Sequence, residues 1–281
     1  MQTVQDVGTL RAKVRSWRSK GETVGFVPTM GNLHAGHESL VALARARTDR
    51  VVVSVFVNPT QFGPGEDFER YPRTLAADQM VLSNAGCDVL FAPDVDTMYP
   101  CGAAQGTVLH VPGLTDMLEG ERRPGHFDGV ATVVCKLFNM AQPDVAVFGQ
   151  KDFQQLRVVE RLVRDLSLPL QILAAPICRA GDGLALSSRN QYLSPAERAR
   201  APLIHATLLK MRELMAEGHA WPAVERAATA QLVRGGFVPD YAAIRRAADL
   251  AEPAAQERTG LVALIAARLG RTRLLDNLVL D

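Results

Sequence analysis

The stretch Val51-Val-Val-Ser-Val-Phe-Val57 decides the fold class of this chain. Nearly all of its residues are apolar and most are β-branched, which favours an extended strand. A strand without alternation of apolar and polar residues is typical of a parallel sheet that is covered by helices on both faces. We therefore predict an α/β fold in which this stretch is a buried strand.

Outward from this stretch, apolar strands and amphipathic helices alternate along the chain. The first helix illustrates the pattern, because apolar side chains from Val7 to Trp17 recur at spacings of three and four residues. The pattern predicts helices at residues 4–20, 39–47, 75–85, 130–140 and 156–166, and strands at residues 23–28, 88–92, 144–148 and 170–177. Alternation with short connections predicts a Rossmann-like, doubly wound parallel sheet, which we assign to a domain over residues 1–177.

The chain changes character after residue 177. Residues 179–183 form a glycine-containing turn, and Ser194 then precedes a predicted long helix over residues 195–217. A second helix and three short strands follow, at residues 223–234, 241–244, 261–267 and 273–278. We predict a smaller α+β domain over residues 178–281.

Composition excludes several classes of protein. The chain has 281 residues, of which 47% are hydrophobic, enough for a sizeable core. A formal net charge of +1 argues against a protein that binds nucleic acid through a broad basic surface. The N-terminus lacks a signal-peptide pattern, and no apolar run reaches the roughly 20 residues that span a bilayer. We expect a cytoplasmic protein with no membrane segment, whose four cysteines are reduced and mostly buried thiols without metal-ligand spacing.

His34 and His37 give the first sign of a chemical site. They end the run Val27-Pro-Thr-Met-Gly-Asn-Leu-His-Ala-Gly-His37, which leaves a predicted strand and opens a helix. The amides and dipole of a helix N-terminus favour an anion, and Gly36 lets a ligand approach the backbone closely. Two imidazoles at this point can donate to a phosphate whose charge grows during a reaction. The alternative is that both histidines are partly exposed and have no special role.

Three further polar segments follow predicted strands. Gly149-Gln-Lys-Asp152 offers a lysine to a phosphate, and Leu186-Ser-Ser-Arg189 offers two hydroxyls and a guanidinium. Asn58-Pro-Thr-Gln-Phe62 and the later Gln155 offer neutral amides, which suit the hydroxyl or carboxylate of a small substrate. Since ligands of doubly wound sheets bind beyond the carboxyl ends of the strands, we expect these segments on one rim. The alternative is that Gly149–Asp152 is a surface turn and that Leu186–Arg189 is a polar linker. Each glutamine could equally lie on ordinary loop or helix surface.

Two charged segments are weaker candidates. The acidic residues Glu66, Asp67 and Glu69 lie in a predicted loop, and Asp78 lies in the helix that follows. A solvated run of charge is the simpler interpretation for most of them. Arg122, Arg123 and His126 form a basic segment that could approach a phosphate. No GxxxxGK[ST] segment is present, so a Walker-type NTPase is not supported.

Five segments match a known family in order along the chain. They are Pro28-Thr-Met-Gly-Asn-Leu-His-Ala-Gly-His37, Phe56-Val-Asn-Pro-Thr-Gln-Phe-Gly63, Tyr71-Pro-Arg73, Gly149-Gln-Lys-Asp-Phe-Gln-Gln155 and Asp182-Gly-Leu-Ala-Leu-Ser-Ser-Arg-Asn190. With them the chain resembles the pantoate–β-alanine ligases, the pantothenate synthetase family, from about residue 2 to the C-terminus. The HxGH and Ser-Ser-Arg elements alone indicate only the wider nucleotidyltransferase superfamily, whereas the two glutamine-containing segments are more specific.

The resemblance implies ATP-dependent amide formation in two steps. The carboxylate of pantoate attacks the α-phosphorus of ATP, which gives pantoyl adenylate and pyrophosphate. The amine of β-alanine then attacks the activated carbonyl, and AMP leaves. The resemblance also implies a homodimer and Mg²⁺, which offsets the charge of the triphosphate, with Asp78 as the candidate residue near the ion.

The resemblance further assigns roles to individual residues. His37, His34 and Lys151 would be catalytic, with His37 as the proton donor. Because a carboxylate is already ionised at neutral pH, we expect His37 to donate a hydrogen bond to the α-phosphate in the first step. Gln61 and Gln155 would hold pantoate, and Gln61 would also lie near β-alanine. Contacts to ATP would come from Met30, Gly31, Asn32, Leu33, His34, Ala35, Gly36, His37, Gly149, Gln150, Lys151, Asp152, Cys178, Leu186, Ser187, Ser188 and Arg189.

Two rival functions place different demands on the same sequence. Another HxGH enzyme, one that joins a nucleotide to a phosphorylated substrate, should carry basic residues where Gln61 and Gln155 stand. Two neutral amides point instead to a hydroxy acid. A non-catalytic nucleotide-binding regulator could keep the glycines of this fold yet lose a histidine or Lys151, and all of these are present.

Overall fold

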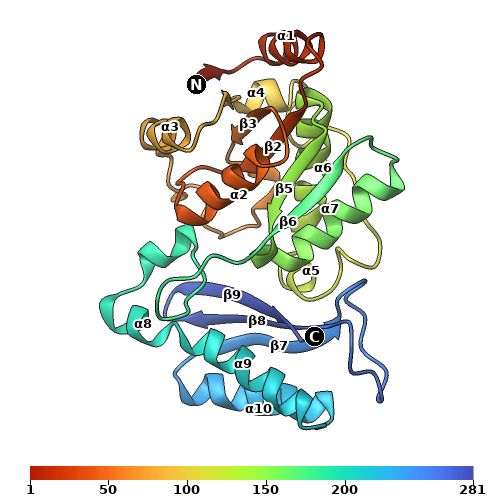
Figure 1. Cartoon of the computed structure of the whole chain (residues 1–281). Coiled ribbons are helices and arrows are strands. Elements are labelled where there is room, and N and C mark those ends of the chain that lie inside the picture. Colours follow the sequence, from red (N-terminus) through yellow and green to blue (C-terminus); the bar gives the residue numbers. More distant parts are fainter. Residues whose placement is uncertain (281) are drawn as a thin grey trace. The chain divides into compact units, whose positions relative to one another are not determined.

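The computed structural model describes residues 1–280, which form two compact units (Figure 1). Unit 1 comprises Met1–Gln150 and Gln155–Pro176, and unit 2 comprises Lys151–Gln154 and Ile177–Asp281. The short segment that carries Lys151 therefore belongs to the same unit as the C-terminal part of the chain.

Unit 1 is built on a six-stranded sheet with the strand order β1-β4-β3-β2-β5-β6. Every pairing in this sheet is parallel, which confirms the fold class predicted from the Val51–Val57 stretch. The order reverses between β2 and β5, as in a doubly wound sheet. The strands are β1 (Gln2–Val4), β2 (Val24–Thr29), β3 (Arg50–Val55), β4 (Val89–Phe91), β5 (Val145–Gly149) and β6 (Gln171–Ala175).

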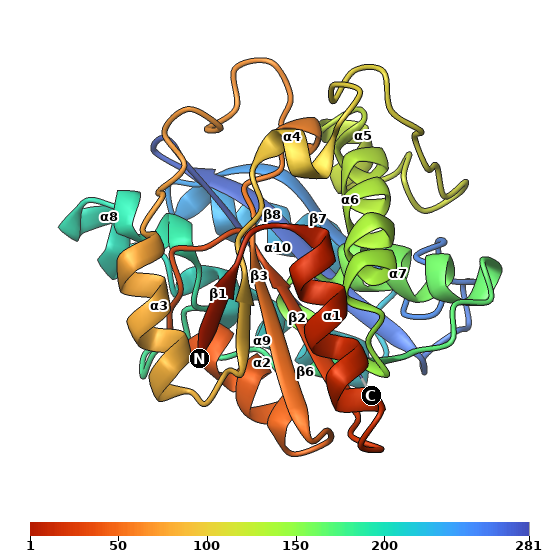
Figure 2. The ribbon, with the colours of Figure 1, turned by 90° about the horizontal axis from the view of Figure 1, so that it is seen from above.

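Helices cover both faces of this sheet (Figure 2). On one face, Val41 of α2 and Leu82 of α3 pack against strand side chains such as Val53. On the other face, α1 lies against α6, and Phe138 of α6 contacts Phe26 of β2. The helices and 3₁₀ turns are α1 (Val7–Arg18), α2 (Ala35–Arg45), η1 (Pro59–Gln61), α3 (Leu75–Asn84), α4 (Val95–Met98), α5 (Glu119–Arg122), α6 (His126–Ala141), η2 (Gln150–Asp152) and α7 (Phe153–Asp165).

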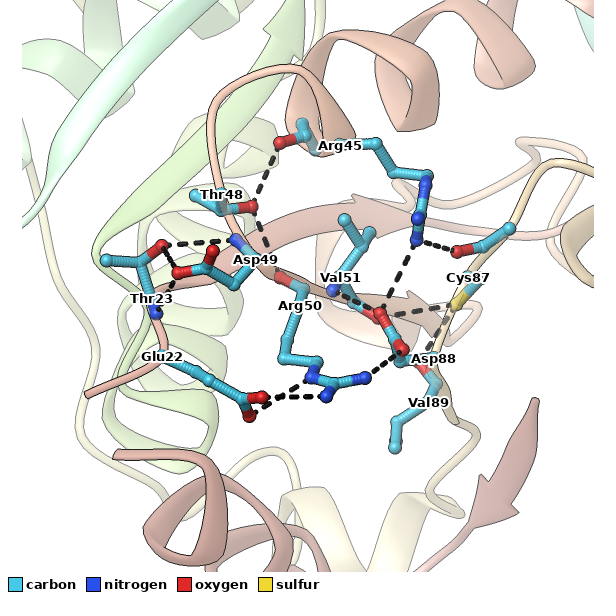
Figure 3. Close-up of polar contacts among 12 residues, drawn as sticks. Glu22, Thr23, Arg45, Thr48, Asp49, Arg50, Val51, Cys87, Asp88 and Val89 are labelled. Atoms are coloured by element: carbon cyan, nitrogen blue, oxygen red, sulfur yellow. Dashed lines mark hydrogen bonds and ion pairs between the residues drawn. The ribbon is translucent and has the colours of Figure 1, made fainter. Parts of the chain in front are cut away.

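A charged cluster fastens the amino ends of the central strands (Figure 3). Asp88 accepts a hydrogen bond from the Val51 amide at 2.8 Å and pairs with Arg50 at 3.2 Å. Arg50 also pairs with Glu22 at 2.7 Å, and these two carboxylates hold the pKa of its guanidinium above the usual value. Ligands of such sheets bind at the opposite, carboxyl ends of the strands, so we assign this cluster to stability.

Unit 2 contains a three-stranded antiparallel sheet in the order β7-β8-β9, which matches the predicted α+β class. Its core joins Leu208 of α9, Leu232 of α10 and Ile265 of β8, all of which are buried. The elements are η3 (Ser188–Tyr192), α8 (Pro195–Arg200), α9 (Leu203–Ala216), α10 (Trp221–Arg234), β7 (Val238–Arg246), β8 (Leu261–Leu269) and β9 (Thr272–Val279).

Two elements differ from the sequence predictions. The predicted helix over residues 195–217 is two helices, because Pro202 has no amide hydrogen to donate and stands at the N-cap of α9. The predicted first helix over residues 4–20 begins only at Val7, because residues 2–4 form the edge strand β1 and Asp6 caps α1 by accepting a hydrogen bond from the Thr9 amide at 2.8 Å. None of the helices formed by residues 1–280 is long and apolar enough to cross a membrane.

Candidate active site

The histidine pair lies where the β2–α2 connection enters α2. His34 is the N-cap residue, and its Nδ1 accepts a hydrogen bond from the Gly36 amide at 3.1 Å. His37 Nδ1 accepts one from the His34 amide at 3.3 Å, and the two ring centroids are 4.2 Å apart. Because each Nδ1 is an acceptor, a neutral ring carries its proton on Nε2. The backbone thus sets both imidazoles as Nε2–H donors at a helix N-terminus.

Asp78 holds the loop that precedes this pair. Its carboxylate accepts hydrogen bonds from the amides of Asn32 at 3.1 Å and Leu33 at 2.8 Å, and the residue is 2% exposed. Gly31 has a φ of 83°, and a Cβ atom there would lie 2.9 Å from Oδ2 of Asp78. Both carboxylate oxygens therefore hold the loop, and the assignment of Asp78 to a position near Mg²⁺ stays a prediction. Within residues 1–280, no group of three His, Cys, Asp or Glu residues is placed to hold a metal ion.

Gln61 lies close to the start of the predicted ATP-binding segment. Its Nε2 donates to Sδ of Met30 at 3.2 Å, and its Oε1 accepts from Nδ2 of Asn58 at 3.1 Å. Asn58 is 1% exposed and also accepts a hydrogen bond from the Tyr99 hydroxyl at 2.7 Å. Sequence reasoning did not single out Asn58 or Tyr99. The signal for Asn58 was its place in the Asn-Pro-Thr-Gln-Phe segment, and Tyr99 carried none.

The basic segment before α6 fastens the Gln61 turn. Nδ1 of His126 donates to the main-chain carbonyl of Gln61 at 2.7 Å, because Nε2 of the same ring accepts from Arg123 at 3.0 Å. Arg123 also donates two hydrogen bonds to Glu66, at 2.7 and 2.6 Å. Burial, together with the charge of Arg123, lowers the pKa of His126 to about 4, so the ring is neutral at physiological pH.

These contacts correct two sequence interpretations. Glu66 is not part of a solvated run, since its side chain forms a half-buried pair with Arg123. Arg123 and His126 do not stand ready for a phosphate, since their donors are directed to Glu66 and to the carbonyl of Gln61. Together they act on the pantoate candidate Gln61 through its backbone.

The other phosphate candidates lie in unit 2, around one pocket. Lys151, Asp152, Ser187 and Arg189 line it, and Nζ of Lys151 is 3.6 Å from Oδ1 of Asp152. Ser187 caps η3, with its Oγ accepting a hydrogen bond from the Arg189 amide at 3.3 Å. Arg273 of β9 lines the same pocket. Sequence reasoning missed it, because an arginine in a short strand carries no signal of its own.

The remaining candidates divide between the units. In unit 2, the Leu186 amide donates to the Cys178 carbonyl at 2.9 Å, so these two residues are joined through their backbones, and Ser188 begins η3. In unit 1, Gly149 ends β5, Gln150 begins η2, and the partly exposed Gln155 lies on α7.

A doubly wound parallel sheet with an HxGH pair at the start of its second helix defines a nucleotide-binding α/β protein of the HxGH type. The family model described as pantoate-beta-alanine ligase matches residues 2–279. The chain therefore belongs to the pantoate–β-alanine ligase family, as the motifs indicated.

Individual relatives agree with this assignment. The chain is 58% identical over 278 residues to the pantothenate synthetase of Xanthomonas axonopodis pv. citri, with 99% of each sequence covered. The crystal structure of pantothenate synthetase from Thermus thermophilus matches with a TM-score of 0.93 and 48% identity, over 100% of this chain and 99% of that one. The Francisella tularensis pantoate-beta-alanine ligase, a complex with "Beta-gamma ATP and Beta-alanine", matches with a TM-score of 0.83 and 32% identity, over 99% and 97% of the two chains.

Proposed function

We propose that this chain catalyses the ATP-dependent condensation of pantoate with β-alanine through a pantoyl-adenylate intermediate. The single observation that carries the proposal beyond family membership is the Gln61–Met30 contact of 3.2 Å, which holds a neutral amide beside the HxGH segment. An amide suits the hydroxyl and carboxylate of a hydroxy acid. The nearby Arg123 does not offer a free charge to a phosphorylated substrate, because Glu66 neutralises it.

The first step needs positioning and charge stabilisation more than a base. The carboxylate of pantoate is ionised at neutral pH and attacks the α-phosphorus of ATP directly. Gln61 and Gln155 hold pantoate for this attack. His34 and His37 donate their Nε2–H groups to the α-phosphate, on which negative charge builds up.

The second step forms the amide. The unprotonated amine of β-alanine attacks the carbonyl carbon of the adenylate near Gln61, and the C–N bond forms. The bond from that carbon to the phosphate oxygen breaks to release AMP, and the nitrogen loses one proton to water. Lys151, Ser188 and Arg189 bind phosphate oxygens. The further ATP contacts are assigned to Met30–His37, Gly149–Asp152, Cys178 and Leu186–Arg189.

Mg²⁺ is proposed to bind together with ATP. Triphosphate oxygens and water supply most ligands of such an ion, with one or two carboxylates at most. The pocket in unit 2 offers the half-exposed Asp152 for this purpose, and no carboxylate cage among the described residues is required. When bound, the ion offsets phosphate charge.

We also propose a cytoplasmic homodimer. All four cysteines are free, which suits a reducing compartment that supplies ATP. The expectation that most of them are buried is wrong, since only Cys87 is buried.

The test is an assay with ATP and pantoate, scored for AMP against ADP, with and without β-alanine. We expect AMP and pyrophosphate, with the amide formed only when β-alanine is present. Release of ADP and phosphate would contradict adenylate chemistry.

Variants in the same assay test the phosphate contacts. His34→Ala and Lys151→Ala should each lower turnover about a hundredfold or more with the fold intact, the scale of losing a preorganised charge stabiliser. Lys210→Ala is the control, because Lys210 pairs with Glu213 on the exposed side of α9. Turnover near that of the wild type in both test variants would overturn the assignment of the phosphate site.

A further inference from the structure

Strand β9 makes contacts in unit 2 that the proposed chemistry leaves unexplained. Asn277 is 3% exposed, and its Nδ2 donates a hydrogen bond to the main-chain carbonyl of Lys151 at 2.9 Å. The two residues are 126 positions apart in the sequence. A buried side-chain amide is thus committed to the backbone of the residue that we assign to the phosphates.

The neighbouring Asp276 holds another part of the same pocket. It is 4% exposed, and its two oxygens accept hydrogen bonds from Arg179 at 2.6 and 2.9 Å. Arg179 also donates to the Gly183 carbonyl at 3.0 Å, which closes the turn that leads into the Leu186–Arg189 segment. The main-chain amide of Asn277 donates to Oδ1 of Asp276 at 2.8 Å, so the Asp276 side chain is linked to the Asn277 backbone.

The position of the Lys151 backbone matters because of the nature of its side chain. A lysine carries a point charge at the end of four flexible carbons, so its value as a phosphate ligand depends on where its Cα is anchored. Asp276 lines the pocket together with Lys151 and Arg189. One strand therefore fixes the phosphate-binding cation and the turn before the Ser-Ser-Arg segment.

We propose that Asn277 and Asp276 are positioning residues for the phosphate site. Asn277 sets the main-chain position from which Lys151 reaches the triphosphate. Asp276, through Arg179, sets the turn before Ser187–Arg189. The proposal rests on the proposed function, because it takes Lys151 as a phosphate ligand.

Asn277→Ala tests the first half. We expect the KM for ATP to rise about three- to tenfold, the scale of one lost buried hydrogen bond, and the KM values for pantoate and β-alanine to stay within twofold. A purely structural role would lower thermal stability without separating the three KM values, and that result would overturn the proposal. If Asn277→Ala does not fold, Asn277→Ser is measured in its place, since its short hydroxyl should not span the distance.

A double-mutant cycle shows whether Asn277 acts through Lys151. ATP affinity is measured by calorimetry in the wild type, Asn277→Ala, Lys151→Ala and the double variant. Once the lysine side chain is gone, removal of Asn277 should cost less than twofold in affinity. Independent, additive losses would contradict the proposal.

Asp276→Asn tests the second half with a matched control. We expect it to raise the KM for ATP selectively, because Arg179 loses its charged partner. Glu225 is a partly buried carboxylate of unit 2 that also pairs with an arginine, Arg245, at 3.0 Å and accepts from the Ile244 amide at 2.7 Å. Glu225→Gln should leave the ratio of the ATP and pantoate KM values unchanged. An equal change of this ratio in both variants would show a general effect of lost buried charge and overturn this half.

The calorimetry also separates the two proposals. ATP binding that depends on Lys151, combined with release of ADP in the assay, would refute the proposed function alone. Wild-type ATP affinity in Asn277→Ala, combined with AMP formation, would refute the positioning role alone.

Discussion

Gly31 lies in the loop before His34, at the point where this loop contacts the carboxylate of Asp78. Its φ is 83°, and an added Cβ would lie 2.9 Å from Asp78 and 3.0 Å from Val55. We expect Gly31→Ala to lower the free energy of unfolding by about 1–3 kcal/mol, from backbone strain and from displacement of Asp78.

Chemical denaturation measures this loss, and Gly65→Ala is its control. Gly65 has a similar φ of 80° but no neighbouring heavy atom within 4 Å of the added carbon. Gly31→Ala should therefore lose more stability than Gly65→Ala. Equal losses would mean that the close approach to Asp78 contributes nothing.

His126 makes stability depend on pH. Its pKa falls from the usual 6.5 to about 4 in the folded chain. Between these two pH values the unfolded chain binds a proton at this histidine and the folded chain does not. The neutral His126 ring makes its full contribution to the free energy of unfolding above pH 6.5, and this contribution is lost as the pH falls toward 4. It amounts to at most about 3 kcal/mol. His126→Gln should flatten the dependence of unfolding free energy on pH in this range.

The exposed His219 supplies the control for that measurement. Its side chain is 55% exposed, so His219→Gln controls for the replacement of a histidine without removing a buried ring. A wild-type slope in His126→Gln would show that the His126 ring titrates normally in the folded chain.

At the scale of the element, the cluster at the amino ends of the strands separates stability from activity. Arg50→Ala removes two ion pairs, but the Arg50 side chain is 36% exposed and solvent screens both pairs, so we expect only a small loss of stability. Urea denaturation should show this loss, while kcat and all three KM values stay at wild-type levels. A selective loss of ATP binding would contradict the assignment of this cluster to stability.

The elements also show what sequence can and cannot predict. The parallel sheet was predictable because all residues of Val51–Val57 except Ser54 are apolar. The histidine pair was predictable because its motif is local to the start of one helix. Strand β1 has only three residues, too few to show a period. The helical pattern continues on both sides of Pro202, so the sequence predicted one helix where the structure has two.

Contacts between distant segments set the limit for the site. His126 and Gln61 are 65 residues apart, and Asn277 and Lys151 are 126 apart. The sequence around one partner does not predict the other partner. A hydrogen bond to a main-chain carbonyl requires no particular residue at the accepting position. The local motifs were therefore predictable, and the residues that support them were not.

At the scale of the whole molecule, the proposed assembly is open to direct measurement. We expect sedimentation equilibrium to give twice the mass of the chain at micromolar concentration, independent of ATP. A mass equal to that of one chain over the same range would contradict the proposed homodimer, without bearing on the chemistry.

The membership of Lys151–Gln154 in unit 2 limits how the gene can recombine. A crossover near residue 177 would import a foreign C-terminal part but keep the native lysine segment, because that segment is encoded upstream. In the chimaera, Lys151 would come from one parent and the residue at position 277 from the other. Successful natural chimaeras of such enzymes should exchange both stretches together, or should join at places where Asn277 and its lysine come from the same parent.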